Sequence, residues 1–79
     1  MKKATAEQRI FVECWKIGKD SQIGIEVKED CFYVFCREIV MYRIADAYGK
    51  KVESKGYSSN LKTHYVCVSL DLPTGFFEA

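Results

Sequence analysis

The sequence lacks the features that mark membrane, secreted and phosphate-binding proteins. No apolar run approaches the roughly 18 residues that a membrane-spanning helix needs. The N-terminal segment has neither the uninterrupted apolar stretch nor the small-residue cleavage site of a secretory signal. The phosphate-loop patterns G-x-G-x-x-G and G-x-x-x-x-G-K-[ST] are absent. We therefore expect a cytoplasmic protein with no membrane partner.

An excess of charge of either sign is also missing. The sequence has twelve Lys and Arg residues and eleven Asp and Glu residues, which gives a net charge of +1. A net charge this small provides no overall electrostatic attraction to nucleic acid. Hydrophobic residues make up 48% of the sequence, which is enough to form one core. A chain of 79 residues is too short to form a second core. These proportions predict one folded domain over residues 1–79.

The clearest strand pattern covers residues 63–72, THYVCVSLDL, where apolar and polar residues alternate. One face carries His64, Val66, Val68, Leu70 and Leu72, and we interpret it as the core face. The opposite face carries Thr63, Tyr65, Cys67, Ser69 and Asp71. Pro73 and Gly75 then end the strand, which leaves residues 73–79 as a C-terminal tail.

A helix is predicted from Arg37 to the residue before Gly49. Val40 and Ile44, followed by Ala47 or Tyr48, recur at helical spacing, and glycine commonly follows a helix end. Before this helix, the alternation in residues 22–27 and the aromatic, β-branched residues 31–36 predict a hairpin. The alternative is one long helix over residues 31–48.

Two segments allow less direct interpretations. Residues 9–17 are rich in β-branched and aromatic side chains and are interpreted as a strand, preceded by an N-terminal arm over residues 1–8. A capping-box pattern at residues 5–8 and a possible helix end at Gly18 leave a helix as the alternative. Residues 49–62 are polar and glycine-containing, which predicts a long exposed loop.

These elements predict an α+β fold. We expect a small single domain with an antiparallel sheet of about four strands and one main helix packed on one face.

Cysteine and histidine are the residue types that favour metal or thiol chemistry. The candidates are Cys14, Cys31, Cys36, Cys67 and His64. Structural zinc sites usually draw their ligands from close C-x₂₋₄-C pairs on tight turns, whereas Cys31 and Cys36 are five positions apart and face opposite sides of a strand. We therefore interpret the cysteines as packed apolar residues and expect no metal and no cofactor. A small zinc or thiol protein remains an alternative.

Catalytic equipment is equally sparse. The only histidine is His64, no C-x-x-C motif is present, and the carboxylates are scattered among other charges, as on solvated faces. We expect no catalytic residue and hence no enzyme.

Aromatic residues are more numerous than one small core can hide, at 14% of the chain. Tyr and Trp are common anchors of protein interfaces. The predicted contact residues are Trp15, Tyr33, Tyr57, Tyr65, Phe76 and Phe77. This pattern favours a non-enzymatic protein-interaction module whose partner is another protein or a second copy, as a homodimer. Such modules include stoichiometric inhibitors and adaptors, among them phage-encoded anti-defence (anti-CRISPR-like) proteins.

A second hypothesis is a small nucleic-acid-binding accessory protein. Its contacts would be the basic residues near the predicted helix and loop, which are Arg43, Lys50, Lys51, Lys55 and Lys62. Interleaved tyrosines could stack on bases, but Asp46 and Glu53 dilute the charge, so this hypothesis ranks second.

Overall fold

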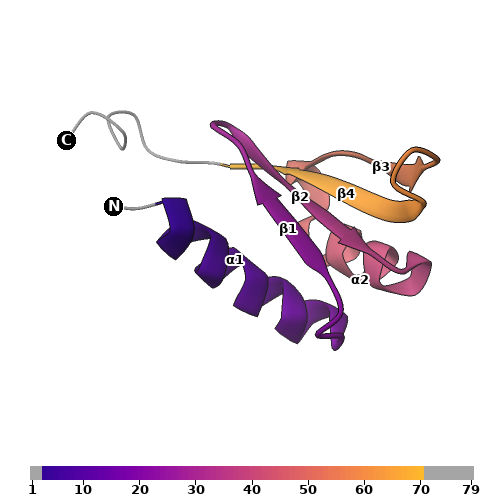
Figure 1. The fold of residues 1–79 in the computed structure, drawn as a ribbon, viewed down its shortest axis with the longest axis horizontal. Coiled ribbons are helices and arrows are strands. Elements are labelled where there is room, and N and C mark those ends of the chain that lie inside the picture. Colours follow the sequence, from indigo (N-terminus) through magenta and orange to yellow (C-terminus); the bar gives the residue numbers. More distant parts are fainter. Residues whose placement is uncertain (1–2, 71–79) are drawn as a thin grey trace.

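The computed structural model describes residues 3–70, with side chains from residue 6 onward. Two helices and four strands follow one another along the chain (Figure 1). They are α1 (Lys3–Gly18), β1 (Gly24–Val27), β2 (Cys31–Cys36), α2 (Glu38–Tyr48), β3 (Val52–Ser58) and β4 (Thr63–Ser69), with a short 3₁₀ turn, η1 (Gly49–Lys51), between α2 and β3. The predicted tail, residues 73–79, lies outside the described residues.

The four strands form one antiparallel sheet in the order β1-β2-β4-β3. The β1-β2 hairpin predicted from the sequence is confirmed, with Ile25 opposite Val34. The strand predicted over residues 63–72 is confirmed for residues 63–69 as β4, which occupies the centre of the sheet beside β2. Leu70 lies beyond the strand, and residues 71–72 lie outside the described residues. Because β2 and β4 are both central strands, their side chains define most of each sheet face.

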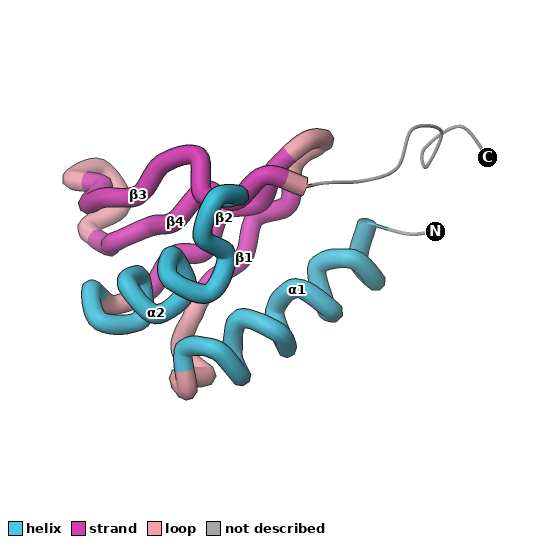
Figure 2. Tube along the Cα trace, turned by 180° about the vertical axis from the view of Figure 1, so that it is seen from behind, coloured by secondary structure: helices cyan, strands magenta, loops and turns pink. Residues whose placement is uncertain are grey.

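Both helices cover the same face of the sheet (Figure 2). Cys14 of α1 and Val40 and Ile44 of α2 are fully buried in one cluster with alternate residues of the strands, among them Val34 and Val66. Helical spacing on α2 and strand spacing on β2 and β4 therefore produce a single apolar layer between helices and sheet. This confirms the α+β fold and the packing of the main helix.

The strand predicted over residues 9–17 is wrong, because this segment belongs to α1. The predicted arm over residues 1–8 is wrong for residues 3–8, which form the first turns of the same helix. Ile10, Cys14 and Ile17 recur at spacings of four and three and pack toward the core. Their periodicity outweighs the strand propensity of the individual residues, and the helix ends at Gly18.

The loop predicted over residues 49–62 is also wrong in its centre, where residues 52–58 form β3. This strand pairs with β4 only and lies at the edge of the sheet, so most of its side chains are exposed. An edge strand needs little apolar material, which explains why its sequence resembles a loop. No helix in the described part of the chain is long and apolar enough to cross a membrane.

Candidate functional site

One face of the sheet has no helix packed on it among the described residues, and we call it the open face. The cross-strand register places the side chains of β2 and β4 that point away from the helices on this face. Its described residues include Gly24, Glu26, Cys31, Tyr33, Phe35, Glu53, Ser54, Gly56, Tyr65, Cys67 and Ser69.

Three aromatic rings occupy the centre of the open face. Tyr33 stacks on Phe35 with centroids 6.1 Å apart and planes inclined by 7°. The Tyr33 and Tyr65 rings lie 6.4 Å apart, inclined by 49°. All three rings are half-buried, because they cover one another and the sheet below. We call these three residues the ring patch.

Two glycines provide the space on which the ring patch lies. A Cβ at Gly56 would meet the Tyr65 hydroxyl at 3.5 Å, and a Cβ at Gly24 would meet Cβ of Phe35 at 3.7 Å. The rings of Phe35 and Tyr65 therefore lie beside strand positions that have no side chain, on the β1 side and on the β3 side of the central pair. These two rings extend the apolar surface from the central strands β2 and β4 toward β1 and β3.

The structure separates the remaining predicted contact residues from this patch. Trp15 lies on α1, on the helix side, with 47% of its surface exposed. Tyr57, 57% exposed, contacts His64 edge to face and points toward the helix side at the β3 edge. Phe76 and Phe77 lie outside the described residues. Of the predicted set, Tyr33 and Tyr65 alone share one surface within the part of the chain that is described.

Most of the described rings keep part of their surface exposed. Phe32 is the one aromatic residue in the buried core of residues 6–70, where its ring meets Tyr48 edge to face. Among the described residues, more aromatic side chains are present than the buried core contains, as the composition predicts.

A second cluster on the open face was not predicted from sequence spacing. Cys31 of β2, Cys67 of β4 and Glu53 of β3 converge, with their ligand atoms all within 4.8 Å of one another. The Cys67 thiol donates a long hydrogen bond to the Glu53 carboxylate, with Sγ and Oε1 3.8 Å apart. Both thiols are buried, while Glu53 is exposed.

The β-bulge in β3 explains how Glu53 reaches the two thiols. The register shifts between Val52 and Ser54, so Glu53 and Ser54 together face the single position of Cys67. Cys31 lies diagonally across from Cys67, because the residue directly opposite Cys31 is Ser69. The convergence thus depends on three strands and on an irregularity, neither of which a spacing motif records.

Burial keeps three of the four thiols protonated at neutral pH. Burial raises the pKa of the Cys31 thiol to about 11, and its interaction with Cys67 adds to the shift. Hydrogen bonding with Cys67 likewise raises the pKa of the Tyr33 phenol. On the helix side, burial raises the pKa of Cys14 to about 12 and that of Cys36 to about 11. Cys14, Cys31 and Cys36 are therefore poor nucleophiles as they stand.

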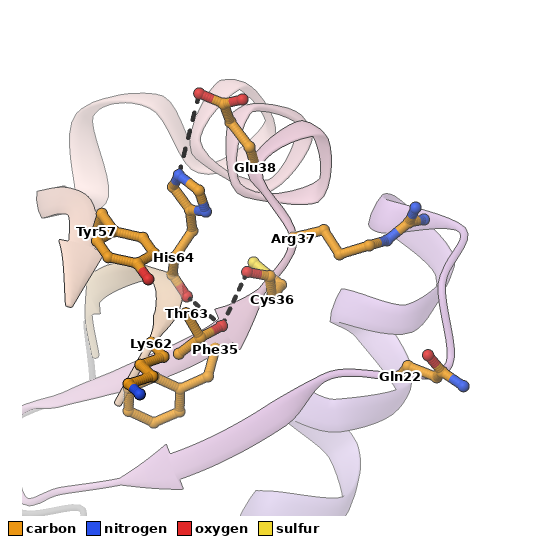
Figure 3. Close-up of a pocket in the computed structure, with 9 residues that line it drawn as sticks. All are labelled: Gln22, Phe35, Cys36, Arg37, Glu38, Tyr57, Lys62, Thr63 and His64. Atoms are coloured by element: carbon orange, nitrogen blue, oxygen red, sulfur yellow. Dashed lines mark hydrogen bonds and ion pairs between the residues drawn. The ribbon is translucent and has the colours of Figure 1, made fainter. Parts of the chain in front are cut away.

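A shallow hollow of about 370 Å³ lies at the other end of the sheet, near the start of α2 (Figure 3). His64 and Glu38 face each other there at 4.0 Å between Nε2 and Oε2. Thr63 donates its hydroxyl hydrogen bond to the carbonyl oxygen of Cys36 at 3.1 Å. His64 is directly opposite Cys36 in the strand register.

This hollow holds a thiol, an imidazole and a carboxylate, but not in the arrangement of an activated nucleophile. Among the hydrogen bonds of the described residues, none joins the Cys36 thiol to His64, and burial keeps that thiol protonated. A cysteine nucleophile needs a base within hydrogen-bonding reach. The Cys36 thiol is therefore not placed as an activated nucleophile.

The basic residues of the second hypothesis do not form one patch. Arg43 donates a hydrogen bond to the carbonyl oxygen of Gly18 at 2.9 Å and so satisfies a carbonyl group at the C-terminal end of α1. Lys50 and Lys51 precede β3, Lys55 lies within it, and Lys62 follows the turn at its far end. Lysines along an edge strand oppose edge-to-edge pairing with other chains, which accounts for Lys55 and its neighbours in structural terms.

The open face with its ring patch and its thiol cluster is therefore the best-defined surface feature of the described chain. No protein-family model, no curated protein and no solved structure matches this chain.

Proposed function

We propose that the chain is a non-enzymatic protein-interaction module that binds through the ring patch on its open face, and that its partner there is a second copy of the chain. The observation that supports this proposal most directly is that three half-buried aromatic rings contact one another on a sheet face that no helix covers among the described residues. Unpartnered sheet faces with an apolar centre are typical of interaction surfaces.

The composition of the open face supports pairing with itself. Apolar rings occupy its centre, and at its margin Lys28 pairs with Glu26 at 3.4 Å. A twofold axis would bring ring patch against ring patch, which is self-complementary. With a net charge of +1, two copies repel each other little.

The size of the face sets the expected strength. With strands about 4.8 Å apart and a rise of about 3.4 Å per residue, a four-stranded face of this length buries on the order of 500 Å² per partner. Interfaces below about 1,200 Å² in total are typical of weak or transient complexes. We therefore expect a weak dimer whose population rises with concentration.

The edges of the sheet are less suited to pairing than the face. The β3 edge carries a β-bulge and Lys55, and β1 is only four residues long. Short, bulged and lysine-bearing edges are the usual means of preventing strand addition. Sheet-on-sheet packing, with a spacing of about 10 Å, is therefore the expected geometry.

A role as stoichiometric inhibitor or adaptor belongs to the same proposal. A foreign protein would compete with the second copy for the ring patch, so dimer dissociation would precede capture. A cytoplasmic location fits the four free cysteines, since reducing compartments keep thiols unpaired.

Sedimentation equilibrium over a range of concentrations tests the proposal. The full chain should show a monomer–dimer equilibrium, Tyr65→Ala should be monomeric, and Tyr42→Ala should dimerise like the wild type. Tyr42 is the matched control, because its ring is 54% exposed on α2, away from the open face. Added salt should change the equilibrium little, whereas nucleic-acid binding falls steeply with salt.

Three results would refute it. The first is a monomer at every concentration. The second is dissociation by Tyr42→Ala rather than by Tyr65→Ala. The third is dimerisation only after removal of residues 73–79, which would assign the ring patch to the chain's own tail. Far-UV circular dichroism of each variant separates loss of association from loss of fold.

A further inference from the structure

We propose that Cys31, Glu53 and Cys67 form a binding site for one thiophilic divalent cation, for which Zn²⁺ is the probe. This inference goes beyond the interaction surface and does not depend on it. The three ligands come from β2, β3 and β4, so the site spans three adjacent strands at one end of the open face.

The distances fit a small coordination sphere. The two sulfurs and a carboxylate oxygen lie within 4.8 Å of one another. Tetrahedral zinc with bonds of about 2.3 Å to sulfur holds two sulfurs about 3.8 Å apart, so side-chain adjustments within the present backbone bring the three atoms to one ion. Two sulfurs and one oxygen leave a fourth position for water.

The donor set favours a thiophilic ion over calcium or magnesium. Calcium and magnesium prefer oxygen ligands, whereas thiolates select zinc and similar ions. Binding displaces one proton from each thiol to solvent, and the ion then neutralises two of the three negative charges of the ligand set. Glu53 is exposed, so the ion reaches the buried sulfurs from the solvent side without opening of the core.

A disulfide between the two cysteines fits the geometry less well. Cys31 and Cys67 are diagonal rather than directly opposite neighbours. Diagonal neighbours on antiparallel strands are typically about 7–8 Å apart at Cα, beyond the usual disulfide range of about 4.4–6.8 Å. A disulfide would also not explain why the Glu53 carboxylate lies close to both sulfurs.

The remaining thiols provide an internal control. Cys14 and Cys36 lie in the core under the helices, and neither belongs to a group of converging ligands among the described residues. Cys36 is on the same strand as Cys31 and is comparably buried, at 4% exposure against 7%. A variant at Cys36 therefore removes a thiol without touching the proposed site.

Competition for Zn²⁺ against a chromophoric chelator, with the reduced full chain, tests the proposal. The wild type should take one zinc per chain, and Co²⁺ should give the charge-transfer absorption of thiolate ligands. Cys67→Ser should abolish binding and Cys36→Ala should retain it. Glu53→Gln should weaken binding by at least about tenfold, since even outer-shell partners of metals are typically worth that much.

Glu53→Gln keeps the test informative if Cys67→Ser fails to fold, because residue 53 is exposed. The proposal is overturned if the wild type leaves the zinc with the chelator. It is also overturned if Cys36→Ala loses as much affinity as Cys67→Ser, or if Glu53→Gln binds as tightly as the wild type. Tyr65→Ala should dissociate the dimer and still bind zinc, so failure of one proposal is distinguishable from failure of the other.

Discussion

At the scale of single residues, Gly18 shows how closely the two helices approach. A Cβ at this position would lie 2.6 Å from Cγ1 of Val40, and Gly18 is buried. Alanine normally stabilises a helix over glycine by about 0.5–1 kcal/mol. Here we expect Gly18→Ala to lower the free energy of unfolding by about 1–3 kcal/mol, because overpacking outweighs propensity. Urea denaturation measures the change.

A double-mutant cycle with Val40→Ala identifies the cause of that loss. Removing the Val40 methyl groups creates the space that the new Cβ needs, so the double variant should be more stable than the sum of the single changes predicts. Additive effects would show that the two positions do not meet.

The buried thiols predict a loss of stability in alkaline solution. From an ordinary value of 9.0, the pKa rises to about 12 for Cys14 and to about 11 for Cys31 and Cys36. Above pH 9 the unfolded chain loses these protons while the folded chain keeps them, so stability is complete below about 9 and falls as pH rises toward the folded values. Each thiol contributes up to about 1.4 kcal/mol per pH unit.

Urea denaturation at a series of pH values measures this slope. Cys14→Ala removes the largest of the thiol shifts and should flatten the dependence above pH 9, although it lowers stability at every pH through the cavity it leaves. An unchanged slope in this variant would mean that Cys14 titrates normally in the folded chain.

At the scale of elements, Arg43 links the two helices and illustrates a basic residue with a structural role. Its guanidinium donates to the carbonyl oxygen of Gly18, at the C-terminal end of α1, where a positive charge also complements the helix dipole. We expect Arg43→Met to lower the free energy of unfolding by about 1–2 kcal/mol, since hydrogen bonds from charged groups are worth about that much.

Lys50→Met is the matched control for this substitution. Lys50 is exposed on η1 and takes part in none of the side-chain hydrogen bonds among the described residues, so its substitution should change the free energy of unfolding by less than about 0.5 kcal/mol. Equal effects of the two changes would point to a general charge effect rather than to the bond with Gly18.

The elements differ in how far their sequences determine them. Val40 and Ile44 on α2, and Val66 and Val68 on β4, follow one period each, and both elements were predicted correctly. The α1 segment carries strand-forming residues at helical spacing, so propensity and periodicity conflict, and the tertiary burial of Cys14 decides for the helix. The sheet has the predicted number of strands, but β3 takes the place of the expected N-terminal strand.

At the scale of the whole molecule, the candidate site depends on register between distant strands. Alternation along one strand was sufficient to predict that Tyr33 and Tyr65 lie opposite the core face. Their meeting requires β2 to pair with β4, and the approach of Glu53 to Cys67 requires a bulge in a segment predicted to be a loop. Non-local pairing leaves no periodic trace in the sequence, so the thiol cluster could not be predicted.

Native-state hydrogen exchange tests the pairing on which both proposals depend. In an antiparallel pair, only alternate residues of an edge strand donate to their neighbour, so alternate amides of residues 52–58 should be protected. Central strands open last, so the amides of β2 and β4 should exchange most slowly. Uniformly fast exchange across residues 52–58 would mean that this segment is the loop that its composition suggests. Glu53 would then not be held beside Cys67, and Gly56 would not lie beneath the ring of Tyr65.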